Sequence, residues 1–169
     1  MLTGNDVYYP LGEGFVWTYQ MNDGSSYTNT IAEAQENAVF IMRNSMMNKN
    51  QQVKKEGTTY LTDSYEEGTM QMFLKDDLSV GNTWEIKFKA NGLDNLLIMT
   101  VKEVGSQKEV NGTTYPEVAL IEAESKLLMN GNLMPLNFFT QYYYAKGIGL
   151  VLTTTSMGDA QGLSDCQLG

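Results

Sequence analysis

Apolar and polar side chains alternate with a period of two along most of this chain, which is the pattern of half-buried β-strands. The alternation is cleanest where Trp84, Ile86 and Phe88 are separated by charged residues. Turn-forming pairs such as Asn111-Gly112 separate the alternating segments at intervals of about ten positions, a spacing typical of sheet proteins. The pattern predicts an all-β fold of about ten antiparallel strands.

A Tyr-rich stretch near the C-terminal end predicts a strand with bulky side chains on both faces. Tyr142 and Tyr144 fall on one face of an extended chain, and Tyr143 falls on the other. Gly147 and Gly149 follow, and glycine adopts backbone angles that are closed to other residues. We therefore expect a bend or bulge there, leading into a second β-branched strand.

Two segments give a less direct signal. Residues 118–129 have the helix propensity of Ala, Leu and Glu, but their position between turn signals favours a long strand. Residues 158–169 have no clear alternation, and we expect them to form a flexible tail.

A short motif occurs twice. Leu11-x-x-Gly14-x-x-Trp17 recurs as Leu78-x-x-Gly81-x-x-Trp84, and these are the two Trp residues of the chain. A repeated motif of this kind predicts a duplicated structural unit. We interpret residues 1–169 as one all-β domain built from two related half-domains, 8–75 and 76–155. The alternative is that both segments independently adopt the same kind of corner.

The two ends of the chain carry motifs that resemble a known group of proteins. Tyr8-Tyr-Pro-Leu-x-x-Gly-x-x-Trp-x-Tyr19 and Tyr143-Tyr-Ala-Lys-Gly-Ile-Gly-Leu-Val151 are similar to the signature of secreted bacterial lipoproteins and envelope proteins of the Bacteroides and Clostridia type. The resemblance implies an extracytoplasmic all-β domain with a strongly curved antiparallel sheet, and a lipid anchor on a cysteine upstream of this chain. We therefore expect the sheet to form a half-barrel or open barrel. It implies no catalytic residues.

Composition narrows the classes of partner. The chain of 169 residues carries a net charge of -9, which repels nucleic acid and anionic surfaces. Cys166 is the one cysteine, so the fold has no internal disulfide, and we expect this thiol to have no special role. Residues 1–6 lack the features of a signal peptide, so the chain is expected to be either cytoplasmic or separated from a leader.

The residue inventory removes most catalytic chemistry. The chain contains no histidine, which excludes Ser-His and Cys-His nucleophile pairs and imidazole zinc sites. Paired carboxylates are the remaining catalytic option, and acids of this kind are usually exposed to solvent. The candidates are Asp63, Glu66, Glu67, Asp76, Asp77, Glu122 and Glu124. We expect no enzyme activity, no cofactor and no metal; the eleven Met residues favour an adaptable apolar lining over copper binding.

Two functions remain open at this stage. The first is a non-catalytic binding module that holds a small apolar or amphipathic ligand on the concave face of the sheet, which predicts a cavity there. The second is a structural or protein-interaction module of the cell envelope whose concave face is filled by its own side chains. The residues that we expect to line the ligand site are Trp17, Tyr19, Trp84, Tyr142 and Tyr144.

Overall fold

The computed structural model describes residues 6–169 and is all-β. Within this range the chain forms twelve strands and one short 3₁₀ turn, η1 (Glu36–Ala38). The strands are β1 (Val16–Met21), β2 (Ser26–Ala34), β3 (Val39–Asn44), β4 (Lys49–Glu56), β5 (Thr59–Thr62), β6 (Gln71–Lys75), β7 (Thr83–Ala90), β8 (Leu93–Val110), β9 (Thr113–Met129), β10 (Asn132–Ala145), β11 (Gly149–Thr155) and β12 (Ala160–Gln167).

All twelve strands belong to one antiparallel sheet with the order β6-β5-β4-β3-β2-β1-β12-β11-β10-β9-β8-β7. Each half of the chain is a six-stranded meander, and the two meanders join where β1 pairs with β12. The sheet curves into a nearly closed barrel whose two edge strands are β6 and β7. This confirms the all-β antiparallel fold, with twelve strands rather than about ten.

Two of the sequence expectations have clear outcomes. Residues 118–129 lie within β9 and are extended, as expected. The expectation of a flexible tail at residues 158–169 is wrong, because residues 160–167 form β12. This strand pairs with β1 on one side and with β11 on the other, so its backbone hydrogen bonds come from strands distant in sequence. Cys166 accordingly lies in a strand, opposite Trp17.

The repeated motif forms the same corner in both places. Gly14 and Gly81 have φ angles of +89° and +94°, a backbone region that favours glycine. The Gly14 N–H donates to the Ile31 carbonyl at 2.8 Å, and the Gly81 N–H donates to the Val101 carbonyl at 2.9 Å. In each corner the residue after the glycine also donates to the carbonyl three positions earlier, at 3.1 and 3.0 Å. The division into two half-domains stays a prediction, but its starting motif has one local structure.

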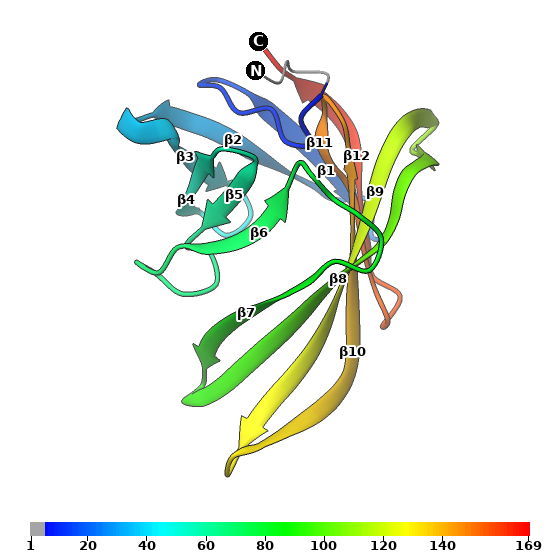
Figure 1. Cartoon of the computed structure of the whole chain (residues 1–169). Helices are drawn as coiled ribbons and strands as arrows, with labels where there is room; N and C mark the ends of the chain where they lie inside the picture. Colours follow the sequence, from blue (N-terminus) through cyan, green and yellow to red (C-terminus); the bar gives the residue numbers. More distant parts are fainter. Residues whose placement is uncertain (1–5) are drawn as a thin grey trace.

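The distal parts of β7, β8, β9 and β10 form a projection that we call the arm, residues 83–98 and 124–139. Figure 1 shows these strands extending away from the rest of the barrel, on the side opposite the C-terminus. The arm ends in two tight hairpins, and in the second of them Asn130 and Gly131 have positive φ angles of 51° and 79°. Such Asn-Gly turns match the twist of a two-stranded hairpin.

The hydrophobic core fills the barrel where the two meanders meet. Its largest fully buried side chains are Trp17, Tyr8, Tyr19, Tyr60, Ile31, Leu74, Ile86, Met99 and Ile121. Helices able to cross a membrane are not found in residues 6–169. Residues 1–6 were considered above for a signal peptide, and of these residues 1–5 lie outside the described part of the chain.

Candidate functional site

Three of the five expected ligand-contacting residues lie in the core. Trp17 has no exposed surface, Tyr19 is 1% exposed and Tyr144 is 5% exposed. The Trp17 indole Nε1 donates to the Ile148 carbonyl at 2.7 Å, and the Tyr19 hydroxyl donates to the Leu150 carbonyl at 2.7 Å. The first bond joins β1 to the Gly147–Gly149 bend and the second joins β1 to β11, so both side chains hold the two meanders together.

Gly149 explains why this bend is built from glycine. Its φ is +113°, and a Cβ atom there would lie 3.1 Å from the Trp17 indole Nε1 and 3.4 Å from the Tyr9 ring. A side chain at Gly149 would therefore be strained by its backbone and crowded by both aromatic rings. The predicted bend is thus what allows Trp17 to reach the Ile148 carbonyl.

The other two expected residues lie at the margin of the core. Tyr142 is partly buried and shares a side-chain hydrogen bond with Tyr65 of the β5–β6 loop, and burial raises the pKa of both hydroxyls. Trp84 packs against the core, but its indole Nε1 is buried without a hydrogen-bond partner. Among the side-chain nitrogen and oxygen atoms of residues 6–169, this one alone is both buried and unsatisfied. It is a donor that an internal water or a ligand oxygen could satisfy.

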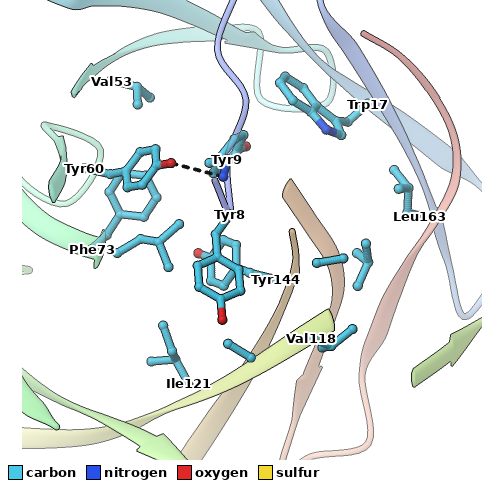
Figure 2. Close-up of a cluster of buried hydrophobic side chains, with 14 of the residues drawn as sticks. Tyr8, Tyr9, Trp17, Val53, Tyr60, Phe73, Val118, Ile121, Tyr144 and Leu163 are labelled. Atoms are coloured by element: carbon cyan, nitrogen blue, oxygen red, sulfur yellow. Dashed lines mark hydrogen bonds between the residues drawn. The ribbon is translucent and has the colours of Figure 1, made fainter. Parts of the chain in front are cut away.

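The N-terminal segment fills the concave side of the sheet, which the sequence analysis did not anticipate. Tyr8 and Tyr9 are 1% and 6% exposed and lie among aromatic side chains from distant strands. The Tyr9 ring packs edge-on against Trp17 at 5.2 Å and against Phe73 at 6.2 Å between centroids. Figure 2 shows Tyr8 and Tyr9 at the centre of this cluster, with Tyr60 and Tyr144 beside them.

A buried polar network fixes this segment in the barrel. The Asp76 carboxylate accepts hydrogen bonds from the Tyr8 backbone N–H at 2.9 Å and from the Tyr60 hydroxyl at 2.9 Å. Lys55 Nζ lies 2.5 Å from the same carboxylate, whose side chain is 2% exposed. Burial and the nearby Asp76 charge raise the pKa of Tyr60 far above its usual value. The Tyr60 hydroxyl therefore stays protonated and accepts from the Tyr9 N–H at 3.2 Å (Figure 2).

Little space remains on the concave side after this filling. One small cavity of about 130 Å³ lies beside the aromatic cluster. Its lining includes Tyr9, Met42, Gln51, Tyr65, Phe73 and Tyr144. This volume is far below the 300–1,000 Å³ of typical ligand pockets. Of the five expected residues, only Tyr144 lines this cavity.

A larger groove lies on the arm, and its volume is about 570 Å³. In the antiparallel register Lys87 is opposite Leu96, and Leu128 is opposite both Asp94 and Leu133, so these side chains share one face of the arm. Ile86 alternates with them and is buried in the core. The groove therefore lies mainly on the outer face of the arm, turned away from the barrel interior, although Phe88 and Asn95 of the other face also line it.

The groove combines an apolar floor with a charged rim. Leu96 is 6% exposed and forms part of the floor, together with Leu128 and Leu133. The charged lining residues are Glu66, Glu85, Lys87, Lys89 and Asp94. This arrangement fits an amphipathic molecule, with its apolar part on the leucines and its polar part at the rim.

The β5–β6 loop and β6 hold β7 in position beside this groove. The Gln71 side-chain amide donates to the Lys87 carbonyl at 2.8 Å and accepts from the Lys87 N–H at 2.9 Å. The rings of Tyr65 and Phe88 are 6.1 Å apart. A single side-chain amide thus makes the contact that a neighbouring strand would otherwise make with β7.

Four of the seven candidate carboxylates, Asp63, Asp76, Asp77 and Glu122, accept hydrogen bonds from neighbouring groups. Asp63 accepts from the Gln52 backbone N–H at 2.8 Å, and Asp77 accepts from the Thr58 hydroxyl at 3.1 Å. Glu122 accepts from the Gln141 amide at 2.9 Å. A search of residues 6–169 finds no group of three or more His, Cys, Asp or Glu side chains able to hold a metal ion.

The sequence contained a signal for the groove that the analysis did not use. Leu127, Leu128 and Met129 precede the Asn130-Gly131 turn, and Leu133 and Met134 follow it. Adjacent strand residues point to opposite faces, so consecutive apolar residues beside a turn indicate apolar surface on both faces of a hairpin.

Comparisons with known proteins identify the fold. No protein-family model matches the chain, and no curated protein matches it. The structure is similar to that of a predicted exported protein with a YmcC-like fold from Bacteroides fragilis, at 10% identity and a TM-score of 0.61, over 95% of this chain and 99% of that one. It is also similar to a predicted lipoprotein from Parabacteroides distasonis, at 11% identity and a TM-score of 0.56, over 95% and 98% of the two chains. At the level of fold, the chain therefore resembles exported proteins and lipoproteins of Bacteroides-type bacteria.

Proposed function

We propose that this protein is a non-catalytic binding module of the bacterial cell envelope, and that it binds an amphipathic ligand in the groove on the outer face of the arm. The observation that carries the proposal is the groove itself, in which Leu96, Leu128 and Leu133 form an apolar floor beneath charged side chains. The similarity in fold to a predicted exported protein and a predicted lipoprotein supports an extracytoplasmic location.

This proposal moves the ligand from the concave face to the arm. Tyr8 and Tyr9 occupy the concave side, and the cavity beside them is about 130 Å³. The groove is about 570 Å³, which lies within the usual range for ligand sites. The rim carries Lys87 and Lys89 together with Glu66, Glu85 and Asp94, and this mixed charge favours a ligand with a strongly polar head group.

Native mass spectrometry with single-chain amphiphiles tests the proposal. Lauric acid and lysophosphatidylglycerol serve as probes, and we expect a one-to-one adduct with the wild-type protein. The double variant Leu128→Gln and Leu133→Gln makes the apolar floor polar and should abolish the adduct. Met129→Ser with Met134→Ser changes the opposite face of the same hairpin and should retain it.

Three outcomes would overturn the proposal. The absence of any adduct with both probes would remove the groove as an amphiphile site. An adduct that survives Leu128→Gln and Leu133→Gln would place the ligand elsewhere. Conversion of either probe into a product would contradict the non-catalytic assignment.

A protein-interaction module is the second candidate function, and the self-filled barrel interior favours it. Here the arm would contact an envelope protein, and the barrel would serve as a rigid support. Under this alternative neither amphiphile binds, while a protein partner recovered by cross-linking to wild type is lost in the Leu128→Gln and Leu133→Gln variant.

A further inference from the structure

The end of the arm is apolar on both of its faces. We call residues 87–96 and 126–136 the arm tip. Its exposed large apolar residues are between 39% and 49% exposed, although most such side chains elsewhere in residues 6–169 are buried or partly buried. They are Leu93, Leu128, Met129, Leu133, Met134 and Leu136.

The strand register assigns these residues to opposite faces. Met134 is opposite Leu127, which is opposite Asn95, and this set alternates with the groove face. Leu128 and Leu133 are opposite each other and belong to the groove face. A protein partner that covers one face would leave the other apolar face in water, whereas an apolar medium that surrounds the tip covers both.

The charge of the tip differs from that of the rest of the molecule. Lys87, Lys89 and Lys126 stand against one acid, Asp94, so the tip carries a net charge of +2. The chain as a whole carries -9, so the remaining residues carry -11. In the field of a negatively charged surface, such a molecule is oriented with its arm tip toward that surface.

The backbone of the tip is paired at its centre and open at its two outer edges. Strands β8 and β9 are paired on both sides up to the last residues of the arm, with Asn132 opposite Met129 at the Asn130-Gly131 turn. Within the described residues, the outer edges of β7 and of β10 before Thr140 have no partner strand. Such edges suit the interfacial layer of a bilayer, where water and lipid head groups can bond to them, and not its hydrocarbon centre. The Asn residues at the turn are polar but uncharged, which suits the interfacial layer of a bilayer better than its hydrocarbon centre.

We propose that the arm tip inserts into the interfacial layer of an anionic lipid bilayer, with its leucines and methionines among the acyl chains and its lysines near the lipid phosphates. A second copy of this chain fits the tip less well. Stable protein interfaces use about 20–30 residues a side, and the tip offers six large apolar residues divided between two faces. The inference does not depend on a ligand in the groove.

Flotation with large unilamellar vesicles tests this inference. We expect the wild-type protein to float with vesicles of three parts phosphatidylcholine to one part phosphatidylglycerol. Met129→Ser with Met134→Ser should weaken partitioning by about tenfold or more, because two side chains lose their transfer into an apolar medium. Leu128→Gln with Leu133→Gln should weaken it to a similar extent, since both faces contact lipid.

A matched control lies at the β3–β4 turn. Met46 and Met47 are 54% and 65% exposed, which exceeds the exposure of the tip methionines. Met46→Ser with Met47→Ser should leave vesicle binding unchanged. Lys87→Gln with Lys89→Gln should weaken binding to the anionic vesicles and reduce its dependence on salt. Thermal denaturation of each variant checks that it is folded.

Several results would overturn the inference. Wild-type protein that does not float with anionic vesicles would do so, as would control and tip variants that bind equally weakly. A concentration-dependent dimer in sedimentation velocity that the Met129→Ser and Met134→Ser variant loses would assign the tip to a second copy. Wild-type protein that forms no adduct with lauric acid or lysophosphatidylglycerol but floats with the vesicles would refute the proposed ligand and leave this inference standing.

Discussion

The two six-stranded meanders meet at two junctions, β1–β12 and β6–β7. These junctions differ, although β1 and β7 both follow the same sequence motif. At the β1–β12 junction, Gln20 of β1 lies opposite Gly162 of β12 within a backbone ladder that has one register shift, between Thr18 and Tyr19. The position equivalent to Gln20 in the second half is Lys87, whose backbone is bonded by the side chain of Gln71. The β1–β12 junction is closed by backbone pairing between two strands. At the β6–β7 junction, the Gln71 side-chain amide makes the hydrogen bonds to the Lys87 backbone. The barrel is therefore held shut unequally, and the arm projects from its weaker side.

The aromatic anchors of the two junctions differ in the same way. Trp17 is fully buried and its indole N–H is bonded to Ile148, whereas Trp84 is partly exposed and its N–H is buried without a partner. Eight residues before Trp17 lies Tyr9, which packs in the core, and eight residues before Trp84 lies Asp76, which binds Lys55. The first copy of the motif is specialised for packing and the second for polar contacts.

The largest expected effect comes from truncating the two Trp side chains. Trp17→Ala should lower the free energy of unfolding by about 3–5 kcal/mol, because it leaves a large cavity. Trp84→Ala should lower it by about 1–3 kcal/mol, because its ring is less buried and makes no hydrogen bond. Urea denaturation followed by circular dichroism measures both.

A conservative pair of variants controls for ring size. Trp17→Phe removes the donor to the Ile148 carbonyl and should cost about 1–3 kcal/mol, whereas Trp84→Phe removes an unpaired donor and should change stability by less than about 1 kcal/mol. Equal losses at Trp17 and Trp84 would contradict the asymmetry. Loss of amphiphile binding in Trp84→Phe at unchanged stability would place its indole N–H in a ligand site.

The corner glycines should respond alike, unlike the Trp residues. Gly14→Ala and Gly81→Ala each place a Cβ where no other atom lies within 4 Å, so the penalty is conformational alone. Positive φ angles cost an L-residue about 1–2 kcal/mol, and we expect a loss of this size in both variants. Urea midpoints measure it. A loss in one variant only would indicate that the two corners are not equivalent.

How far the sequence predicts this fold depends on whether the signal is local. The alternation around Trp84 predicts its strand, because that strand is half-buried and pairs with its chain neighbour. Strand β12 was missed because Gln161, Gly162 and Ser164 have weak strand propensity, and its extended form comes from pairing with distant β1. The burial of Tyr8 and Tyr9 was missed because they precede Pro10 in a segment with no period.

The buried tyrosines predict a stability that falls at alkaline pH. Burial raises the pKa of Tyr9 well above 10, so the folded form keeps a proton that the unfolded chain releases. The stabilising contribution is complete below about pH 10 and is lost as the pH rises further, at about 1.4 kcal/mol per pH unit for each such group. Tyr9→Phe removes one of these groups, so its free energy of unfolding should fall less steeply with pH.

Urea midpoints at pH 9, 10 and 11 measure this slope for wild type and Tyr9→Phe. Tyr8→Phe is the control, because the pKa of Tyr8 is raised less strongly than that of Tyr9. Identical slopes for wild type and Tyr9→Phe would mean that the Tyr9 hydroxyl reaches solvent.

The smallest expected effect concerns the Gln71 side-chain amide, which links β6 to β7. Gln71→Ala removes both hydrogen bonds to the Lys87 backbone, and their position at a partly exposed edge limits the global loss to about 0.5–1.5 kcal/mol. The local effect should be larger, since no other strand covers the outer edge of β7. We expect the Lys87 amide hydrogen to exchange with solvent about tenfold faster, measured by NMR.

Gln71→Glu separates the two bonds of this amide. A carboxylate can still accept from the Lys87 N–H but cannot donate to its carbonyl, so exchange at Lys87 should lie between wild type and Gln71→Ala. Protection at Gln20, the equivalent position on β1, should not change in either variant, because β12 supplies its partner through the backbone. If exchange at Gln20 and Lys87 rises together, the two junctions open as one unit, and the arm has no independent motion. If Lys87 alone is affected, the arm can separate from β6 while the β1–β12 ladder stays intact.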